Sequence, residues 1–178
     1  MYKRQVEEVP SCFAVTGLSA TSTGSSSADV TFTDPNSASE YFVTYTDGVT
    51  TDTVSPNPTS TSVSLSGLSA NTTYTVSVQA LCGAGDSSAV ASTSVTTDCG
   101  SFSIPWSEGF ESLTSTGTTI YPSCWSKESG SWRSSSNTYY ASPIGNYYIA
   151  ARYNTSNGYM WSPGFDLTAG TSLSLIHI

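Results

Sequence analysis

The feature that most constrains the fold of this sequence is a strictly alternating run that follows a turn. Residues 67–80 read GLSANTTYTVSVQA, and every second residue from Tyr74 to Ala80 is apolar while those between are polar. A period of two places one set of side chains in a core and the other in water, as in a half-buried β-strand. Charged residues make up only 10% of the chain. The many Val, Thr and Tyr residues favour strand over helix throughout.

Six further short strands are predicted in the first half of the chain. They cover residues 13–18, 28–35, 41–45, 49–54, 62–66 and 89–97. Asp47-Gly48 is a hairpin-turn signal after the third of the seven strands. Pro56 and Pro58 end the segment 49–54, which suits a short edge strand because proline cannot donate to a ladder. Seven short strands with regular turns indicate a β-sandwich.

The spacing from Leu68 to Tyr74 resembles the tyrosine corner of fibronectin type III domains, in which a Tyr hydroxyl ties a turn to nearby backbone. With the strand order, it makes residues 6–98 resemble a fibronectin type III domain. Phe32 stands where many family members carry a core Trp, which is a conservative change. The resemblance implies an all-β sandwich. The chain has no Arg-Gly-Asp, so integrin-type binding has no motif to rest on.

The composition changes after Cys99, where aromatic residues become frequent. The organising motifs are Phe110-Glu111, Pro122-Ser123-Cys124-Trp125, Trp132 and Ser162-Pro163-Gly164-Phe165-Asp166-Leu167. Their order resembles the opening half of cleaved-adhesin and MAM-like jelly-roll domains, which occur beside fibronectin type III modules in secreted and surface proteins of Bacteroidetes-type bacteria. The resemblance implies an incomplete jelly-roll β-sandwich over residues 99–172. The acidic, Gly-rich loop that cleaved adhesins often carry is absent.

The two ends of the chain are predicted to be foreign to the protein. One coding of residues 173–177 is CTG TCT CTT ATA CAC, whose reverse complement encodes Val-Tyr-Lys-Arg-Gln, or Met-Tyr-Lys-Arg-Gln with GTG as start codon. The latter is the sequence of residues 1–5. Such an inverted repeat resembles a translated sequencing adapter, and coincidence is the alternative. We expect residues 1–5 and 173–178 to be adapter-derived and the insert to be an internal piece of a longer protein.

The four cysteines have no Cys-x-x-Cys spacing of the kind that zinc and redox sites use. In a Ser/Thr-rich chain that resembles surface modules, disulfides are the favoured interpretation, and four reduced thiols are the alternative. In the fibronectin fold, the start of the first strand and the end of the sixth lie at the same pole. Of three possible connectivities, the resemblance therefore favours Cys12–Cys82 and Cys99–Cys124, the second as a tie that stiffens the junction with the next domain.

Two acidic residues in the second half are candidate calcium ligands. Glu111 and Asp166 are hard oxygen donors, and their positions match acidic residues of MAM-like and adhesin jelly rolls, where a structural ion can sit. Two solvated surface acids are the alternative. Apart from calcium, we expect no cofactor.

The aromatic residues also suggest carbohydrate binding, because flat rings stack on sugar faces. Trp125, Trp132 and Trp161 lie in strand-like segments with apolar neighbours, which predicts that they are core residues. The predicted exposed ligand-binding residues lie near polar Asn/Ser loops; they are Tyr139, Tyr140, Tyr147 and Tyr153. Adjacent tyrosines on a strand point to opposite faces, so one of each adjacent pair is expected to be buried.

The sequence argues against several classes of function. A net charge of −8 opposes nucleic-acid binding, and no apolar run approaches the roughly 20 residues that span a bilayer. The single histidine, His177, lies in the adapter-like end, so a serine nucleophile lacks a base. Glu108 and Glu111 differ by three positions and would face opposite sides of a flat strand, which argues against a paired-carboxylate hydrolase.

These observations predict a non-catalytic part of a modular secreted or cell-surface protein. We expect it to act in adhesion or as a spacer through contacts with cell-surface glycan or protein. The alternative is an accessory region of a secreted peptidase or glycoside hydrolase whose catalytic domain lies outside this sequence, and a purely structural stalk is a third interpretation.

Overall fold

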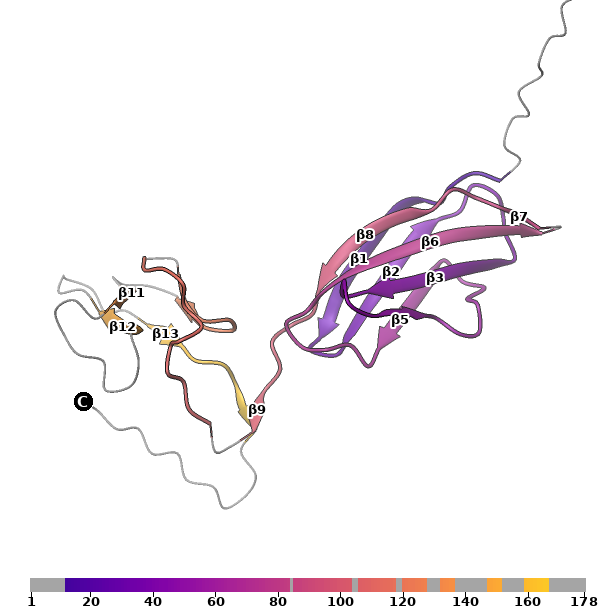
Figure 1. The fold of residues 1–178 in the computed structure, drawn as a ribbon. Coiled ribbons are helices and arrows are strands. Elements are labelled where there is room, and N and C mark those ends of the chain that lie inside the picture. Colours follow the sequence, from indigo (N-terminus) through magenta and orange to yellow (C-terminus); the bar gives the residue numbers. More distant parts are fainter. Residues whose placement is uncertain are drawn as a thin grey trace, which may run out of the picture. The chain divides into compact units, whose positions relative to one another are not determined.

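The computed structural model describes residues 12–83, 85–103, 106–117, 120–127, 132–136, 147–151 and 159–166. The chain divides into two compact units, residues 1–98 and 99–178 (Figure 1). Over the described ranges the structure is all-β and contains no helix, in agreement with the predicted fold class. In those ranges, accordingly, no helix has the length and apolar character needed to cross a membrane. Both adapter-like ends lie outside the described residues.

The first unit is a sandwich of two antiparallel sheets (Figure 1). One sheet has the order β1 (Thr16–Gly24), β2 (Ser27–Thr33) and β5 (Ser62–Ser66). The other has the order β4 (Thr51–Thr53), β3 (Glu40–Thr46) and β6 (Thr73–Gly83), and both β7 (Asp86–Ser87) and β8 (Ala91–Thr96) pair with β6. Strand β6 is therefore the centre of the larger sheet.

The alternation predicted for residues 74–80 is confirmed along β6. Tyr74, Val76, Val78 and Ala80 are buried, while the residues between them face outward. The buried set packs against the inward faces of the other strands and forms one core; it comprises Cys12, Val15, Ala28, Val30, Phe32, Tyr41, Val43, Val63, Leu65, Leu68, Tyr74, Val76, Val78, Ala80 and Val95. Phe32 and Tyr41 meet edge to face at 4.8 Å, so an aromatic pair fills the position where Phe32 replaces the more usual Trp.

The tyrosine corner is also confirmed. The backbone N–H of Ser69 donates a hydrogen bond of 2.9 Å to the hydroxyl of Tyr74. Leu68 is buried beneath the same turn, which Gly67 and Asn71 close with positive φ angles of 75° and 48°. Glycine and asparagine adopt this region more readily than other residues, which explains their place in the turn.

The first strand differs from the prediction. It runs from Thr16 to Gly24 rather than over 13–18. The side chain of Asn36 takes both backbone groups of Phe13: the N–H of Phe13 donates to Oδ1 at 2.7 Å, and Nδ2 donates to the Phe13 carbonyl at 2.6 Å. Phe13 therefore stays outside the ladder. The Ser/Thr-rich residues 19–24 pair with β2 through backbone groups. Their weak hydrophobic alternation did not indicate a strand in the sequence.

The last strand of the sandwich is divided in two. Ser87 pairs with Leu81 and Ala91 pairs with Val78, so the edge segment holds one residue more than β6 between these pairs. At this bulge the hydroxyl of Ser88 accepts a hydrogen bond from the N–H of Ala80 at 2.9 Å. The N–H of Ser88 donates to the carbonyl of Ala80 at 2.9 Å. A side chain thus replaces the carbonyl that a regular ladder would supply.

The described part of the second unit contains three short ladders and an isolated antiparallel bridge between Gly117 and Ser134. Strand β9 (Phe102–Ser103) pairs in parallel with β14 (Phe165–Asp166). Strand β10 (Ser126–Lys127) pairs antiparallel with β13 (Met160–Trp161), and β11 (Trp132–Ser136) with β12 (Tyr147–Ala151). These strands are β elements beyond the sandwich. The jelly-roll assignment stays a prediction.

Two motifs that were strand candidates form turns instead. The carboxylate of Glu108 accepts a hydrogen bond of 2.6 Å from the N–H of Phe110, whose φ angle is +60°. The N–H of Trp125 donates to the carbonyl of Pro122 at 3.2 Å, and Cys124 has a φ angle of +68°. Backbone in this left-handed region cannot continue a strand, so the argument that Glu108 and Glu111 face opposite sides of one strand does not apply.

Several aromatic rings pack against one another in the described part of the second unit. Trp106 lies at the centre of the group, with its ring centroid 4.9 Å from that of Phe165, 5.6 Å from Phe102 and 6.4 Å from Trp125. Phe110 adds a further contact to Trp125 at 5.5 Å. We call Phe102, Trp106, Phe110, Trp125 and Phe165 the aromatic cluster. The half-buried Trp125 lies within it, as expected of a core residue, and the side chain of Trp132 lies outside the described set.

Both favoured disulfides are present. Cys12–Cys82 spans 70 residues within the first unit, and Cys99–Cys124 spans 25 residues. Since the second unit begins at Cys99, the second disulfide lies inside that unit and is not a tie between domains. No described cysteine is free.

Candidate functional site

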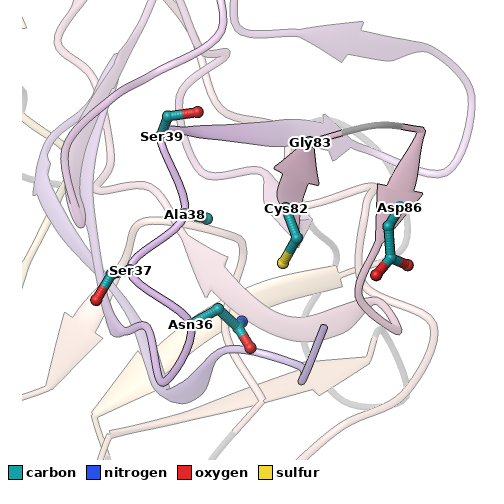
Figure 2. A pocket seen from close by; sticks show the side chains of 7 residues that line it. All are labelled: Asn36, Ser37, Ala38, Ser39, Cys82, Gly83 and Asp86. Carbon is teal, nitrogen blue, oxygen red and sulfur yellow. The ribbon is translucent and has the colours of Figure 1, made fainter. Parts of the chain in front are cut away.

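A hollow of about 540 Å³ opens at one end of the sandwich. It is lined by the loop before β3 and by the end of β6 with the start of β7; the lining residues are Asn36, Ser37, Ala38, Ser39, Cys82, Gly83 and Asp86 (Figure 2). In Figure 2 the hydroxyl of Ser37 points away from Cys82 and Asp86. The disulfide from Cys82 to Cys12 fixes one side of this hollow.

The carboxylate of Asp34 organises the loop that lines the hollow. Its Oδ1 accepts hydrogen bonds from the backbone N–H and the side-chain amide of Asn36, at 2.9 and 2.8 Å. Its Oδ2 accepts from the N–H of Ala38 at 2.6 Å and from the hydroxyl of Tyr41 at 3.1 Å. Asn36 in turn holds the backbone of Phe13. One carboxylate thus connects the loop, β3 and the segment that precedes β1.

These contacts shift the acid–base properties of two groups in opposite directions. Burial by itself would raise the pKa of Asp34, but the hydrogen bonds from Asn36, Ala38 and Tyr41 favour the carboxylate and together lower its pKa. Burial raises the pKa of Tyr41, and the hydrogen bond to Asp34 and its negative charge raise it further. The pair is therefore an ionised carboxylate with a neutral phenol, which suits a structural role.

The stability of the first unit should depend on pH through Asp34. Because its folded pKa lies below the unfolded value of about 3.9, the carboxylate stabilises the fold above that value, and the contribution is lost as the pH falls through the folded pKa. Asp34→Ala should therefore destabilise the unit at pH 7 and cost progressively less below pH 4, as measured by urea unfolding at pH 7, 4 and 2.5. Asp29→Ala removes a carboxylate with one exposed hydrogen bond, from Ser64, and serves as control. An Asp34→Ala penalty that is equal at pH 7 and pH 2.5 would contradict the prediction.

The hollow offers little catalytic chemistry. Ser37 and Ser39 have no histidine beside them in the described part of the chain, so neither has the base that a nucleophilic serine needs. Over the same ranges, no group of three or more His, Cys, Asp or Glu side chains could hold a metal ion. We regard the hollow as a consequence of the loop that Asp34 holds in place.

The described candidate residues Glu111, Tyr147 and Asp166 lie on different elements of the second unit. Glu111 is an exposed residue of a turn, and Asp166 is an exposed residue of β14 opposite Ser103. The calcium site at these two residues stays a prediction. Tyr147 is half-buried at the start of β12, where it pairs with Ser136. The other predicted ligand-binding tyrosines lie outside the described residues; they are Tyr139, Tyr140 and Tyr153.

The core prediction for Trp161 is wrong. Its side chain is 56% exposed, and Tyr159, two residues earlier, is 53% exposed. The two rings are nearly parallel, with an interplanar angle of 16° and centroids 6.4 Å apart. Sequence reasoning placed Trp161 in the core because its segment is apolar. The i, i+2 spacing of the two aromatic residues was the available signal that both side chains point to the same side of an extended chain.

Comparison with known proteins bears on the first unit. Residues 13–97 match the family model described as the fibronectin type III domain. Among solved structures, the chain is similar to the fn3 domain of human collagen alpha-1(XX) chain, with 26% identity over 54% of this chain and 95% of that chain, and a TM-score of 0.48. It is also similar to a two-domain fibronectin type III segment from chicken tenascin, with 25% identity over 48% of this chain and 50% of that chain, and a TM-score of 0.44. The comparison with curated proteins gave no match.

The family match, together with the tyrosine corner, supports a fibronectin type III domain over residues 13–97. Domains of this family occur in modular adhesion and extracellular proteins, where they mediate protein interactions and are typically non-catalytic. The two disulfides are typical of extracellular proteins as well.

Proposed function

We propose that this chain is a non-catalytic part of a modular secreted or cell-surface protein and that it contacts glycan or protein ligands through its second unit. The observation that carries the proposal is the exposure of Tyr159 and Trp161, two large aromatic side chains that lie two positions apart in the sequence and stack on each other. Side chains of this kind are enriched where proteins bind their ligands, since one flat ring supplies a large contact area at small entropic cost.

The first unit supports the proposal as a scaffold. Several of its polar groups that could bind a ligand are engaged in its own structure: Asp34 holds the loop before β3, Ser88 completes the ladder of β6, and Thr97 bonds to the turn 69–72. A disulfide-linked sandwich with such internal bonding is suited to act as a spacer for the unit that binds the ligand.

The proposal is tested with the full chain on an array of glycans and extracellular proteins. We expect binding to at least one class of ligand. Hydrogen exchange on the bound chain should then show protection in peptides from residues 99–166 rather than 12–98. Protection confined to residues 12–98 would contradict the assignment to the second unit, and the absence of any binding would contradict a contact role.

A further inference from the structure

We infer that Tyr159 and Trp161 form a stacking platform for a neutral pyranose chain. This inference rests on the proposed function and names its ligand class. The centroid separation of 6.4 Å and the angle of 16° fall within the range of offset-parallel aromatic pairs, so the two rings present similarly oriented faces. Both side chains are more than half exposed. Two exposed rings side by side form one continuous apolar surface, and such surfaces mark sites of interaction.

Tyr159 and Trp161 are not members of the aromatic cluster defined above. In the described part of the chain, the ring contacts that join the aromatic cluster include neither Tyr159 nor Trp161. Met160 lies between them in sequence and is half-buried, so it points to the opposite side of the strand. Along residues 159–161, one half-buried side chain therefore alternates with two exposed rings.

The cross-strand partners determine what lies beside the rings. Ser126 pairs with Trp161 and shares its face, whereas Lys127 pairs with Met160 and lies on the other face. Ser126 is exposed. Within the described pairs of this ladder, the residue opposite Trp161 therefore carries a hydroxyl, and the charged side chain of Lys127 lies on the other face. A hydroxyl both donates and accepts, as do the hydroxyl groups of a sugar.

The net charge of the chain disfavours some of the ligand classes that stack on aromatic rings. Nucleobases, acidic sugars and neutral pyranoses can all lie on aromatic rings. The net charge of −8 repels phosphates and carboxylates, which disfavours nucleic acids and acidic glycans. A β-linked glucose chain has its hydroxyls equatorial, so its axial C–H groups form apolar faces that match a ring surface. The geometry and the charge together point to a neutral β-linked pyranose chain.

The test uses calorimetric titration of the full chain with cellohexaose, a neutral β-linked probe. We expect binding by the unaltered chain that is weakened about tenfold or more by Trp161→Ala, as for the loss of one stacked ring elsewhere. Tyr159→Ala should weaken it less, while Trp161→Phe and Tyr159→Phe should retain most of it. Phe42→Ala, which removes an exposed ring from β3 in the first unit, is the matched control. Circular-dichroism melting identifies variants that remain folded.

Three outcomes of this titration would overturn the inference. Equal affinity of Trp161→Ala and the unaltered chain for cellohexaose would refute the platform while leaving the proposed function intact. No binding to cellohexaose, laminarihexaose, xylohexaose or mannohexaose would refute it as well, whereas binding of the chain to another array ligand would preserve the proposed function. Tighter binding to oligogalacturonate than to cellohexaose would refute the neutral assignment.

Discussion

A chain in which both Cys12 and Cys82 are replaced by alanine should lose about 4 kcal/mol of first-unit stability. The disulfide closes a loop with a sequence separation of 70 residues, and its removal frees the unfolded chain of that constraint. Cys12 is only 5% exposed, so the unit also loses packing within the core. A loss of this size should lower the melting temperature of a domain of this length by more than about 15 °C.

All four tryptophans lie in the second unit, so their fluorescence reports that unit and not the sandwich. The unfolding of the first unit is better followed by amide signals in two-dimensional NMR during a urea titration. Cys99→Ala/Cys124→Ala is the matched control, because that disulfide lies within the second unit and should leave the stability of the first unchanged. A Cys12→Ala/Cys82→Ala chain within about 1 kcal/mol of the control would contradict the prediction.

The second large effect concerns Thr97, whose side chain is only 3% exposed. Its hydroxyl donates to the carbonyl of Ser69 at 2.6 Å and accepts from the N–H of Thr72 at 3.0 Å. Valine has almost the same shape and would leave both backbone groups without this partner. We expect Thr97→Val to destabilise the first unit by about 1–3 kcal/mol in urea unfolding.

The neighbouring Thr96 provides the control for Thr97. It is an exposed threonine whose hydroxyl lies 2.8 Å from that of Thr73 on the outer face of the sheet. Since water can replace that contact, Thr96→Val should change the stability by less than about 0.5 kcal/mol. Equal effects of the two substitutions would show that the hydroxyl of Thr97 is not needed to hold the turn.

The sequence predicted the parts of the fold that depend on local pattern. Alternation identified β6, and the Leu68–Tyr74 spacing identified the corner that the Ser69–Tyr74 bond confirms. The disulfide pairing followed from the resemblance. For β6 and the corner, the relevant residues carry the signal themselves, as a period of two and as a fixed spacing.

The remaining features depend on partners far away in the sequence. Nothing in the residues around Thr97 or Ser88 shows that a hydroxyl there would bond to a turn or replace a ladder carbonyl. Asn36 likewise removes Phe13 from the first strand across 23 positions. The exposure of Trp161 depends on what packs against its strand, which an apolar segment does not specify. The candidate site was therefore less predictable than the fold.

The Cys12–Cys82 bond has a mechanical consequence for a module held in a chain under tension. A pull that enters before Cys12 and leaves after Asp98 passes across the disulfide and bypasses the residues between the two cysteines. With about 3.3–3.6 Å per extended residue, the bond withholds roughly 240 Å of chain from extension. Only the short segment that carries β7 and β8 can be drawn out. The module would therefore resist lengthening and behave as a nearly inextensible link.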